Sequence, residues 1–492
     1  MKNGKYLNLK NNRVLIIFSI LVLSLILRLY FVFYTDNFYG AIPAQKIIHS
    51  QSVSADVIGS IWEVDPILYP YLLKVWMSVF GKIDISPRIL SLLFGMLTFM
   101  PFFLTVRIIK DELHAILATF LIGFFPIHII WSTLSMEEAP FYFIVFSALY
   151  LFFKYKFGSP KRIYLVLSAI LISCSFGFRF EGILYPVVLT LFLLKDKDKK
   201  NIFIFLAVSL SLPILWMLLC WMRYKNPFVS FARHSFYSHL EVADRYSLRF
   251  IIDKIKMSFS VSLLPLGIWG YFITIRDKKM RIINAIFFLF LFAFIIKILT
   301  KTLLWQERYL LCFGLFFLIY IAIGIVYLSK CLKNYMAKVI LILIFCLYNI
   351  FFTVDYISHN KNDFLLNSEI KNIINYLSNI NDKSKILIDI DEDHGYPELI
   401  AVYSNIDLER VKISQEIDVY GNKVLHDIQM KDYKNRLLNF INNKYFDYII
   451  YSPKGRSLRW LFSLKSENER IGKIRYKRTF TGEIYWIYRR ET

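Results

Sequence analysis

Eleven apolar runs separated by polar segments constrain the fold of this 492-residue sequence more than any other feature. The runs are 14–34, 87–106, 113–131, 139–153, 163–178, 182–194, 202–222, 257–275, 282–300, 309–329 and 339–357. A membrane-spanning helix needs roughly 17 to 25 apolar residues, and it satisfies its own backbone polar groups in lipid. The pattern therefore predicts a polytopic α-helical membrane protein with about eleven transmembrane helices. Three runs are short (139–153, 163–178 and 182–194), so ten to twelve spans fit the sequence.

The composition excludes two other classes of protein. The chain is 57% hydrophobic, which is more apolar side chain than a soluble domain carries. Its formal charge of +22 does not indicate a nucleic-acid partner, because the cations lie in short segments between apolar runs. The five cysteines show no CxxC spacing, so the sequence indicates neither a zinc site nor a disulfide framework.

Lys and Arg gather in alternate connections, including 154–162 and 195–200. Cytoplasmic loops carry this excess, which predicts a cytoplasmic N-terminus, an odd number of spans and an extracytoplasmic C-terminal domain in the cell membrane. The run 14–34 is longer than the apolar core of a signal peptide, and no small-residue cleavage site follows it. We expect it to be an uncleaved first span.

The chain divides into two expected domains. We expect residues 1–358 to form a transmembrane domain, whose first extracytoplasmic loop, 35–86, holds amphipathic helices over Tyr39–His49 and Ile67–Phe80. Residues 359–492 predict a small α/β or α+β domain, with a helix in NSEIKNIINYLSNIN and strands in KILIDID, FDYIIYS and EIYWIYRR. The acidic residues 389–393 fit a solvated turn at a strand end better than a cation site.

Charged residues recur at the outer ends of different runs. They are Arg28 and Asp36, Glu137 and Glu138, Arg179 and Glu181, and Lys301, Glu307 and Arg308. Charges near hydrocarbon usually face a bundle interior and mark a functional path. Simpler explanations stand beside this one: an outer carboxylate is often solvated, Arg28 can reach the headgroups, His128 fits a packed histidine, and Asp65 fits a helix cap. Helical spacing does not decide whether Glu137 or Glu138 points inward.

Several motifs in order resemble a known family. They are RLYFVFYTDNFYGAIPAQKI, DPILYPYLLKVWMSVFG, SPRILSLLFGMLTFMPFFLTVRII, FFPIHIIWSTLSMEEAPFYFIVFSALYLFF, FRFEG and ERYLL. Together they resemble the GT-C fold glycosyltransferases that use polyprenyl-phosphate sugars, a group that includes the protein O-mannosyltransferases and the lipid A aminoarabinose transferases. The resemblance covers most of the membrane part.

The resemblance implies a hexosyl- or pentosyltransferase that moves sugar from a polyprenyl-phosphate donor to a glycan, lipid or protein acceptor, with inversion. Asp36 matches the family's general base and Glu138 its second acidic site. Arg308 holds the RY position that binds donor phosphate, with Arg179, Lys301 and Arg28 as further candidates. Possible substrate contacts are Glu137, Glu181, His128, Asp65 and Tyr39. The donor is the only small molecule implied, with no separate cofactor and no metal, and the other partners are the acceptor and membrane lipids.

The sequence departs from the family's pattern at three places. It reads Asp36-Asn37 where many relatives have Asp-Glu, Asp65-Pro66 where many have a proline pair, and RYLLCF where proline usually follows RYLL. These departures leave the subfamily and the sugar open. The absence of a WWD motif argues against an oligosaccharyltransferase catalytic subunit. A lipid-linked sugar flippase or transporter and a non-enzymatic membrane scaffold remain alternatives, although we find no internal repeat of the kind transporters often show.

Overall fold

A computed structural model gives the architecture of the chain. It describes residues 9–38, 42–53, 66–81, 84–195, 198–230, 248–260, 262–300, 307–380, 383–389, 396–404, 406, 410–413, 435, 438–439, 441–443, 446–453, 458, 464 and 466–491. The chain forms two compact units. Unit 1 contains residues 1–35 and 52–362, and unit 2 contains residues 36–51 and 363–492.

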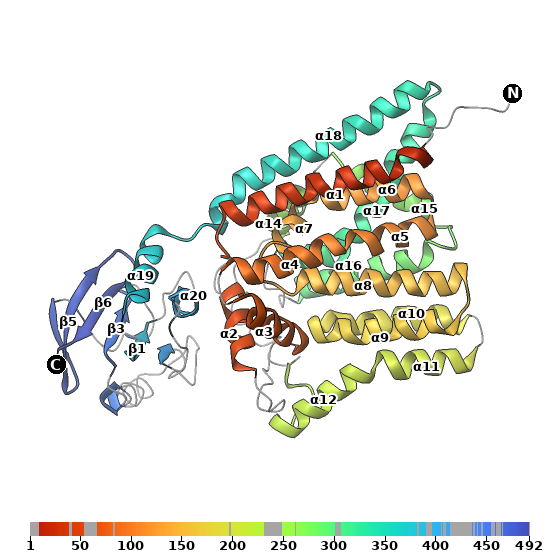
Figure 1. The fold of residues 1–492 in the computed structure, drawn as a ribbon. Coiled ribbons are helices and arrows are strands. Elements are labelled where there is room, and N and C mark those ends of the chain that lie inside the picture. Colours follow the sequence, from red (N-terminus) through yellow and green to blue (C-terminus); the bar gives the residue numbers. More distant parts are fainter. Residues whose placement is uncertain are drawn as a thin grey trace. The chain divides into compact units, whose positions relative to one another are not determined.

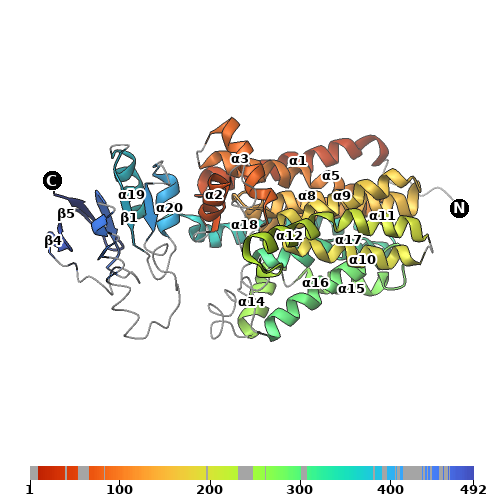
Figure 2. The ribbon, with the colours of Figure 1, turned by 90° about the horizontal axis from the view of Figure 1, so that it is seen from below.

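Unit 1 is helical in the part that the structure describes (Figures 1 and 2). Its elements are α1 (Leu9–Tyr34), α3 (Leu68–Phe80), α4 (Ile85–Leu97), α5 (Phe99–Ile109), α6 (Glu112–Gly123), α7 (Pro126–Trp131), α8 (Glu138–Phe153), η1 (Lys154–Gly158), α9 (Arg162–Phe178), η2 (Phe180–Ile183), α10 (Leu184–Leu194), α11 (Lys199–Ser209), α12 (Ser211–Tyr224), α14 (Leu248–Phe259), α15 (Leu264–Thr274), α16 (Arg281–Leu299), η3 (Glu307–Leu310), α17 (Leu311–Cys331) and α18 (Tyr335–Asn360). Each predicted apolar run contains one of these helices or a consecutive pair. The prediction of a polytopic helical membrane protein is confirmed.

The membrane-spanning helices are judged by their length and apolar composition. Within the described residues, six helices are long and apolar enough to cross a membrane, or seven if the bent pair α11 and α12 forms one span. Four more apolar helices are shorter: α6, α9, α10 together with η2, and α15. The run 139–153 proves longer than the sequence suggested, because α8 continues through the π-helical turn η1 to Gly158. The predicted number of eleven stays a prediction.

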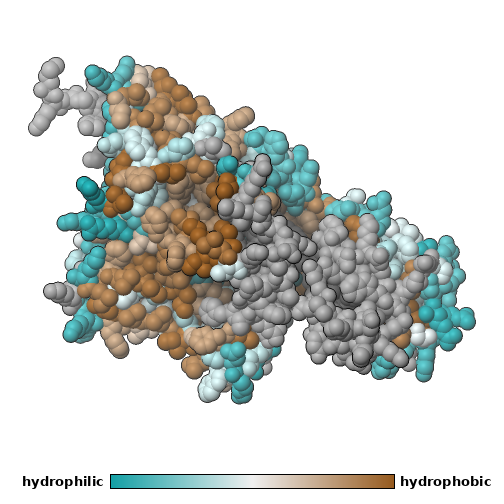
Figure 3. All heavy atoms as spheres, turned by 180° about the vertical axis from the view of Figure 1, so that it is seen from behind, coloured by the Kyte–Doolittle hydropathy of each residue, from teal (hydrophilic) through white to brown (hydrophobic). Residues whose placement is uncertain are grey.

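Helix α17 forms the centre of unit 1. Nearly all of its side chains are buried, and it packs against α6, α15, α16 and α18. The contact with α15 is close because a Cβ atom at Gly270 would overlap the Tyr320 carbonyl, and one at Gly324 would overlap the Leu266 carbonyl. Small residues allow this approach of helix backbones in membrane proteins. The outer surface of the helical unit is also apolar, as the side chains gathered over it in Figure 3 show.

Unit 2 contains a six-stranded mixed sheet. Its strands are β1 (Ile386–Ile388), β2 (Val411–Ile413), β3 (Tyr448–Tyr451), β4 (Asn468–Ile471), β5 (Ile474–Thr481) and β6 (Trp486–Arg490), in the order β2-β1-β3-β6-β5-β4. Strand β1 is parallel to both β2 and β3, and the remaining neighbours are antiparallel. The predicted C-terminal α/β or α+β region is confirmed, with its helix at α19 (Ser368–Ser378) and its three strands at β1, β3 and β6.

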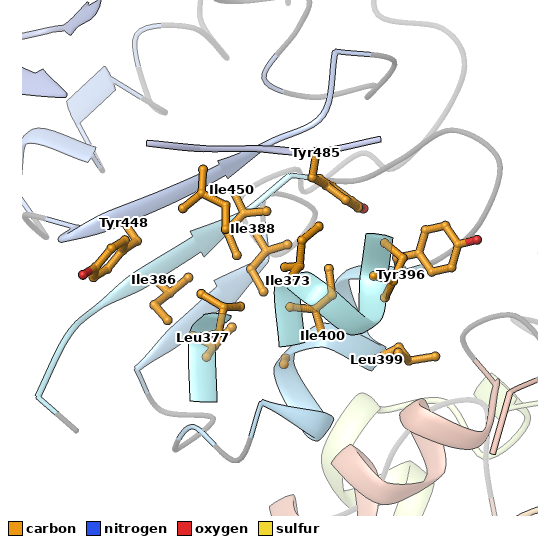
Figure 4. Packing of buried hydrophobic residues seen from close by; sticks show 14 of the residues in the cluster. Ile373, Leu377, Ile386, Ile388, Tyr396, Leu399, Ile400, Tyr448, Ile450 and Tyr485 are labelled. Carbon is orange, nitrogen blue, oxygen red and sulfur yellow. The ribbon is translucent and has the colours of Figure 1, made fainter. Parts of the chain in front are cut away.

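One face of this sheet is covered by helices α19 and α20 (Tyr396–Tyr403), as Figure 4 shows. The alternation of side chains along each strand places Ile386, Ile388, Ile450 and Ile487 on that face. The segment 36–51, which includes most of α2 (Ile42–Ser52), joins the same core through Phe38 and Ala44. The first part of the predicted loop 35–86 is therefore packed into unit 2, whereas α3 belongs to unit 1.

Candidate active site

Five charged residues meet at one end of unit 1, and we call them the buried charge cluster: Glu137, Glu138, Arg179, Glu181 and Arg308. Arg179 donates from Nη1 to Glu138 and from Nη2 to Glu181 Oε1 at 2.9 Å. Arg308 Nη1 lies 3.4 Å from Glu137 Oε1 and 3.3 Å from Glu138 Oε1. Glu138 is 1% exposed and Arg179 5%, so these charges balance one another away from water. Both glutamates that the sequence left open point inward.

Breaks between helices supply these side chains. Helix α7 ends at Trp131, and α8 begins again at Glu138 with Pro140 in its first turn, where proline is tolerated. A carboxylate at this helix N-terminus also complements the helix dipole. On the neighbouring helix, α9 stops at Phe178, and Arg179 has an extended backbone with φ −148° and ψ 137°. These two breaks direct Glu138 and Arg179 toward each other.

Gly182 is required by the fold of η2. A Cβ atom there would lie 2.5 Å from the Phe176 nitrogen and 2.7 Å from the Ser175 carbonyl carbon, because η2 turns back on the end of α9. We expect Gly182→Ala to move Glu181 and Arg179 and to lower activity at least tenfold, since displacements of about 1 Å at a site cost up to roughly 10²-fold. Gly158→Ala is the matched control, because a Cβ there meets nothing closer than 3.8 Å. Equal activity of the two variants would contradict this reading of η2.

The two arginines of the cluster are held differently. Arg179 has two short carboxylate contacts, whereas the carboxylate contacts of Arg308 lie near the limit of hydrogen bonding. The guanidinium of Arg308 also lies over the rings of Trp131 and Tyr309, at 5.9 and 5.5 Å from their centroids. In the part of the chain that the structure describes, Nε of each arginine is buried and has no hydrogen-bond partner. These two Nε–H groups are thus unsatisfied donors among the described residues.

Sequence reasoning missed two residues near this cluster. Tyr69 of α3 is 1% exposed, and burial together with the negative charge of Glu137 raises the pKa of its phenol well above the usual range. Its hydroxyl therefore stays protonated, since the contact with the Ser91 side chain lowers the pKa by less than burial raises it. Lys297, at the end of α16, lies with its Nζ 5.8 Å from the Tyr309 ring centroid. The ILYPY motif marked the segment of Tyr69, but no local signal marked its hydroxyl.

Arg28 and His128 lie together within the bundle. The Arg28 guanidinium is fully buried and reaches His128 Nδ1 at 2.7 Å, Ser132 Oγ at 3.0 Å, the Gly123 carbonyl at 3.0 Å and the Ser24 carbonyl at 3.2 Å. These contacts join α1 to α6 and α7 and include no member of the buried charge cluster. The structure thus places both predicted site residues in a helix-packing network.

Arg88 of α4 is also buried, and the sequence did not single it out. It donates to the Thr35 carbonyl at 2.6 Å and the Val32 carbonyl at 2.9 Å, at the end of α1 where carbonyls lack intrahelical partners. It also donates at 3.3 Å to the Phe31 carbonyl, which accepts from the Thr35 N–H and hydroxyl as well. Its Nε also donates to the Thr133 carbonyl at 2.8 Å, in the break that precedes α8. One side chain therefore fixes the end of α1 and the segment leading to the cluster.

We expect Arg88→Met to destabilise the protein by at least about 2 kcal/mol, because several buried carbonyls lose a charged donor. The thermal midpoint of the detergent-solubilised protein measures the loss. Arg276→Met is the control, since Arg276 is exposed. An unchanged midpoint for Arg88→Met would show that these carbonyls find other donors.

Asp36 belongs to unit 2. Its Oδ2 accepts from the Leu366 backbone N–H at 2.6 Å and from Lys371 Nζ at 2.9 Å, and its own N–H donates to the Phe364 carbonyl at 2.9 Å. Among the other predicted site residues, Tyr39, Asp65 and Lys301 lie outside the described residues. The described part of the chain holds no group of three or more His, Cys, Asp or Glu side chains that could bind a metal ion.

The fold is shared with solved membrane glycosyltransferases. ArnT from Cupriavidus metallidurans bound to undecaprenyl phosphate matches with TM-score 0.65 and 10% identity, covering 97% of this chain and 98% of that chain. The archaeal oligosaccharyltransferase AglB from Archaeoglobus fulgidus, in complex with an inhibitory peptide and a dolichol-phosphate, matches with TM-score 0.59 and 14% identity, covering 89% of this chain and 69% of that one. The chain has the GT-C fold.

A family model also matches part of the chain. Residues 64–221 match the model described as dolichyl-phosphate-mannose-protein mannosyltransferase. This segment includes Tyr69, Arg88, Glu138 and Arg179 but ends before Arg308. No curated protein matches the sequence significantly. The fold and the apolar helices together identify an integral membrane protein.

Proposed function

We propose that this GT-C protein transfers a sugar from a polyprenyl-phosphate donor to a lipid, glycan or protein acceptor. The observation that carries the proposal is the buried charge cluster, in which the Nε–H groups of Arg179 and Arg308 have no acceptor among the described residues. A polyprenyl-phosphate sugar keeps its isoprenoid in the bilayer and presents a phosphate at the interface. Arginine recognises such a phosphate through charge-assisted hydrogen bonds that are often bidentate.

Arg308 is the better phosphate ligand of the two. Its longer carboxylate contacts cost less to exchange for phosphate oxygens than those of Arg179. Arg179 is held by Glu138 and Glu181 and so keeps the glutamates oriented. We assign Arg28 to helix packing, because its guanidinium makes hydrogen bonds with Gly123, His128 and Ser132, in or next to α6 and α7. Lys297 replaces it as a further candidate for charge near the donor.

The reaction needs one proton acceptor. In the proposed step the acceptor oxygen or nitrogen forms a bond to the anomeric carbon while the bond from that carbon to the phosphate oxygen breaks. The acceptor proton goes to the Asp36 carboxylate, and polyprenyl phosphate leaves carrying the electron pair of the broken bond. Attack opposite the phosphate inverts the anomeric centre. The order of Lys and Arg along the chain favours the extracytoplasmic side for this reaction and for the C-terminal unit.

The two rival functions make different demands on the same protein. A flippase moves the lipid-linked sugar between leaflets and leaves it chemically unchanged, whereas a scaffold does neither. Purified protein in liposomes with a radiolabelled polyprenyl-phosphate hexose or pentose separates the three. We expect polyprenyl phosphate to accumulate as labelled sugar leaves the lipid. Intact donor that changes leaflet would replace the proposal with the flippase, and intact donor that stays in place across several sugars would favour the scaffold.

A further inference from the structure

The segment that carries Asp36 is built into unit 2. Asn37 is 1% exposed, and its Nδ2 donates to the Tyr403 hydroxyl at 2.9 Å. The Phe38 ring stacks on Tyr396 of α20 with centroids 5.9 Å apart, and Ala44 is fully buried in the core under α19 and α20. The conformation around Asp36 is therefore determined by residues more than three hundred positions away.

Helix α19, which carries Lys371, is held in place by hydrogen bonds at its first turn and by the core of unit 2. The Asn367 side chain caps its first turn by accepting from the Glu369 N–H at 2.8 Å. Glu369 in turn accepts from the N–H groups of Glu483, Ile484 and Tyr485 at 2.8 to 2.9 Å, which fastens the helix to the turn before β6. Since Ile370, Ile373 and Leu377 face the core, Lys371 points away from it.

Both side-chain contacts of Asp36 fall on the same oxygen. The Leu366 N–H and the Lys371 ammonium bind Oδ2, at 2.6 and 2.9 Å. In the described part of the chain no partner contacts Oδ1. A carboxylate held in this way has a fixed plane and one oxygen open to a substrate proton, as a positioned base requires.

We propose that Lys371 positions Asp36, so that unit 2 sets the orientation of the base and Oδ1 receives the acceptor proton. This inference rests on the proposed function of Asp36. The ion pair itself adds little to folding, because the Lys371 side chain is 47% exposed and that of Asp36 is 29% exposed. Its loss is expected to appear in the rate of the chemical step and not in stability.

The test compares Lys371→Met, Lys371→Arg and Asp36→Asn in the full-length protein with a labelled polyprenyl-phosphate sugar. Lys371→Met should lower kcat roughly tenfold, a fraction of the 10²–10⁴ that a positioned base supplies. The KM for the donor and the thermal midpoint should not change, and Lys371→Arg should restore most of the rate. Lys477→Met, at an exposed position on β5, controls for the loss of a lysine charge from unit 2.

The double variant Asp36→Asn/Lys371→Met distinguishes the positioning role of Lys371 from the role of Asp36 as the base. It should be no slower than Asp36→Asn, because a positioning residue has no effect without the base that it positions. A raised donor KM in Lys371→Met would make Lys371 a phosphate ligand and overturn the inference. An unchanged kcat in Lys371→Met, with Asp36→Asn inactive, would also overturn it while leaving the proposed function intact. Full activity of Asp36→Asn would remove the base and with it the proposed function.

Discussion

Asp36→Asn is expected to lower the rate of sugar transfer by about 10²–10⁴-fold, because an amide does not accept the acceptor proton. The side chain keeps its size, and its carbonyl oxygen can still accept from the Leu366 N–H. Donor binding should therefore survive. Single-turnover transfer and equilibrium binding of the same labelled donor measure the two quantities on one preparation.

Asp36→Glu is the matched variant, since it keeps the carboxylate and moves it by one methylene. We expect it to retain more activity than Asp36→Asn. If Asp36→Asn loses donor binding in proportion to rate, the carboxylate supports the site structurally and is not the base. If the two variants lose the same activity, position and charge are not separable at this residue.

Arg179→Met should destabilise unit 1 by about 3–5 kcal/mol, the range found when one partner of a buried ion pair is removed. The variant leaves Glu138 in the bundle without its short contact and leaves Glu181 without its 2.9 Å contact. A clear fall in the thermal midpoint of the purified protein is the expected result. Loss of activity should accompany it, because the glutamates are no longer oriented.

The compensating variant distinguishes charge from packing. Arg179→Met together with Glu138→Gln removes the carboxylate that has lost its short contact with Arg179 and keeps its 3.3 Å contact with Arg308, so part of the lost stability should return. Activity should stay low, since the cluster no longer holds its charges. A midpoint as low as that of Arg179→Met alone would mean that the arginine stabilises through packing against the rings of Phe141 and Tyr309, at 6.0 and 5.8 Å from their centroids, and not through Glu138.

Periodicity and composition predicted the secondary structure of this chain well. The apolar runs each contain helices, and the β-branched segments near Ile386, Tyr448 and Trp486 form strands. Charge spacing indicated that Glu138, Arg179 and Arg308 come from different helices, and the structure brings them together. The break between Trp131 and Glu138 was predicted, whereas the breaks at Thr98 and Leu210 fall inside single predicted runs and divide each run between two helices.

The sequence did not predict the contacts between residues that are far apart in the chain. Arg88 looks like an ordinary arginine near a helix start, yet it binds carbonyls at the end of α1, more than fifty residues earlier. Lys371 looks like a surface lysine, and only the fold places its ammonium on Asp36. The sequence also grouped segment 36–51 with the membrane part, since no composition change marks it, whereas its Phe38 and Ala44 complete the core of unit 2. Such contacts are decided by tertiary structure, for which a single sequence carries no local pattern.

The central claim is that the acceptor attacks the anomeric carbon and that a lipid phosphate leaves. A donor with ¹⁸O in the oxygen that joins sugar to phosphate tests it most directly, with wild-type protein in liposomes and an envelope fraction of the source cells as acceptor. The account predicts that all of the ¹⁸O stays in polyprenyl phosphate while the sugar appears on the acceptor with inverted configuration. Recovery of ¹⁸O with the transferred sugar, or of unchanged donor after prolonged incubation, would contradict it.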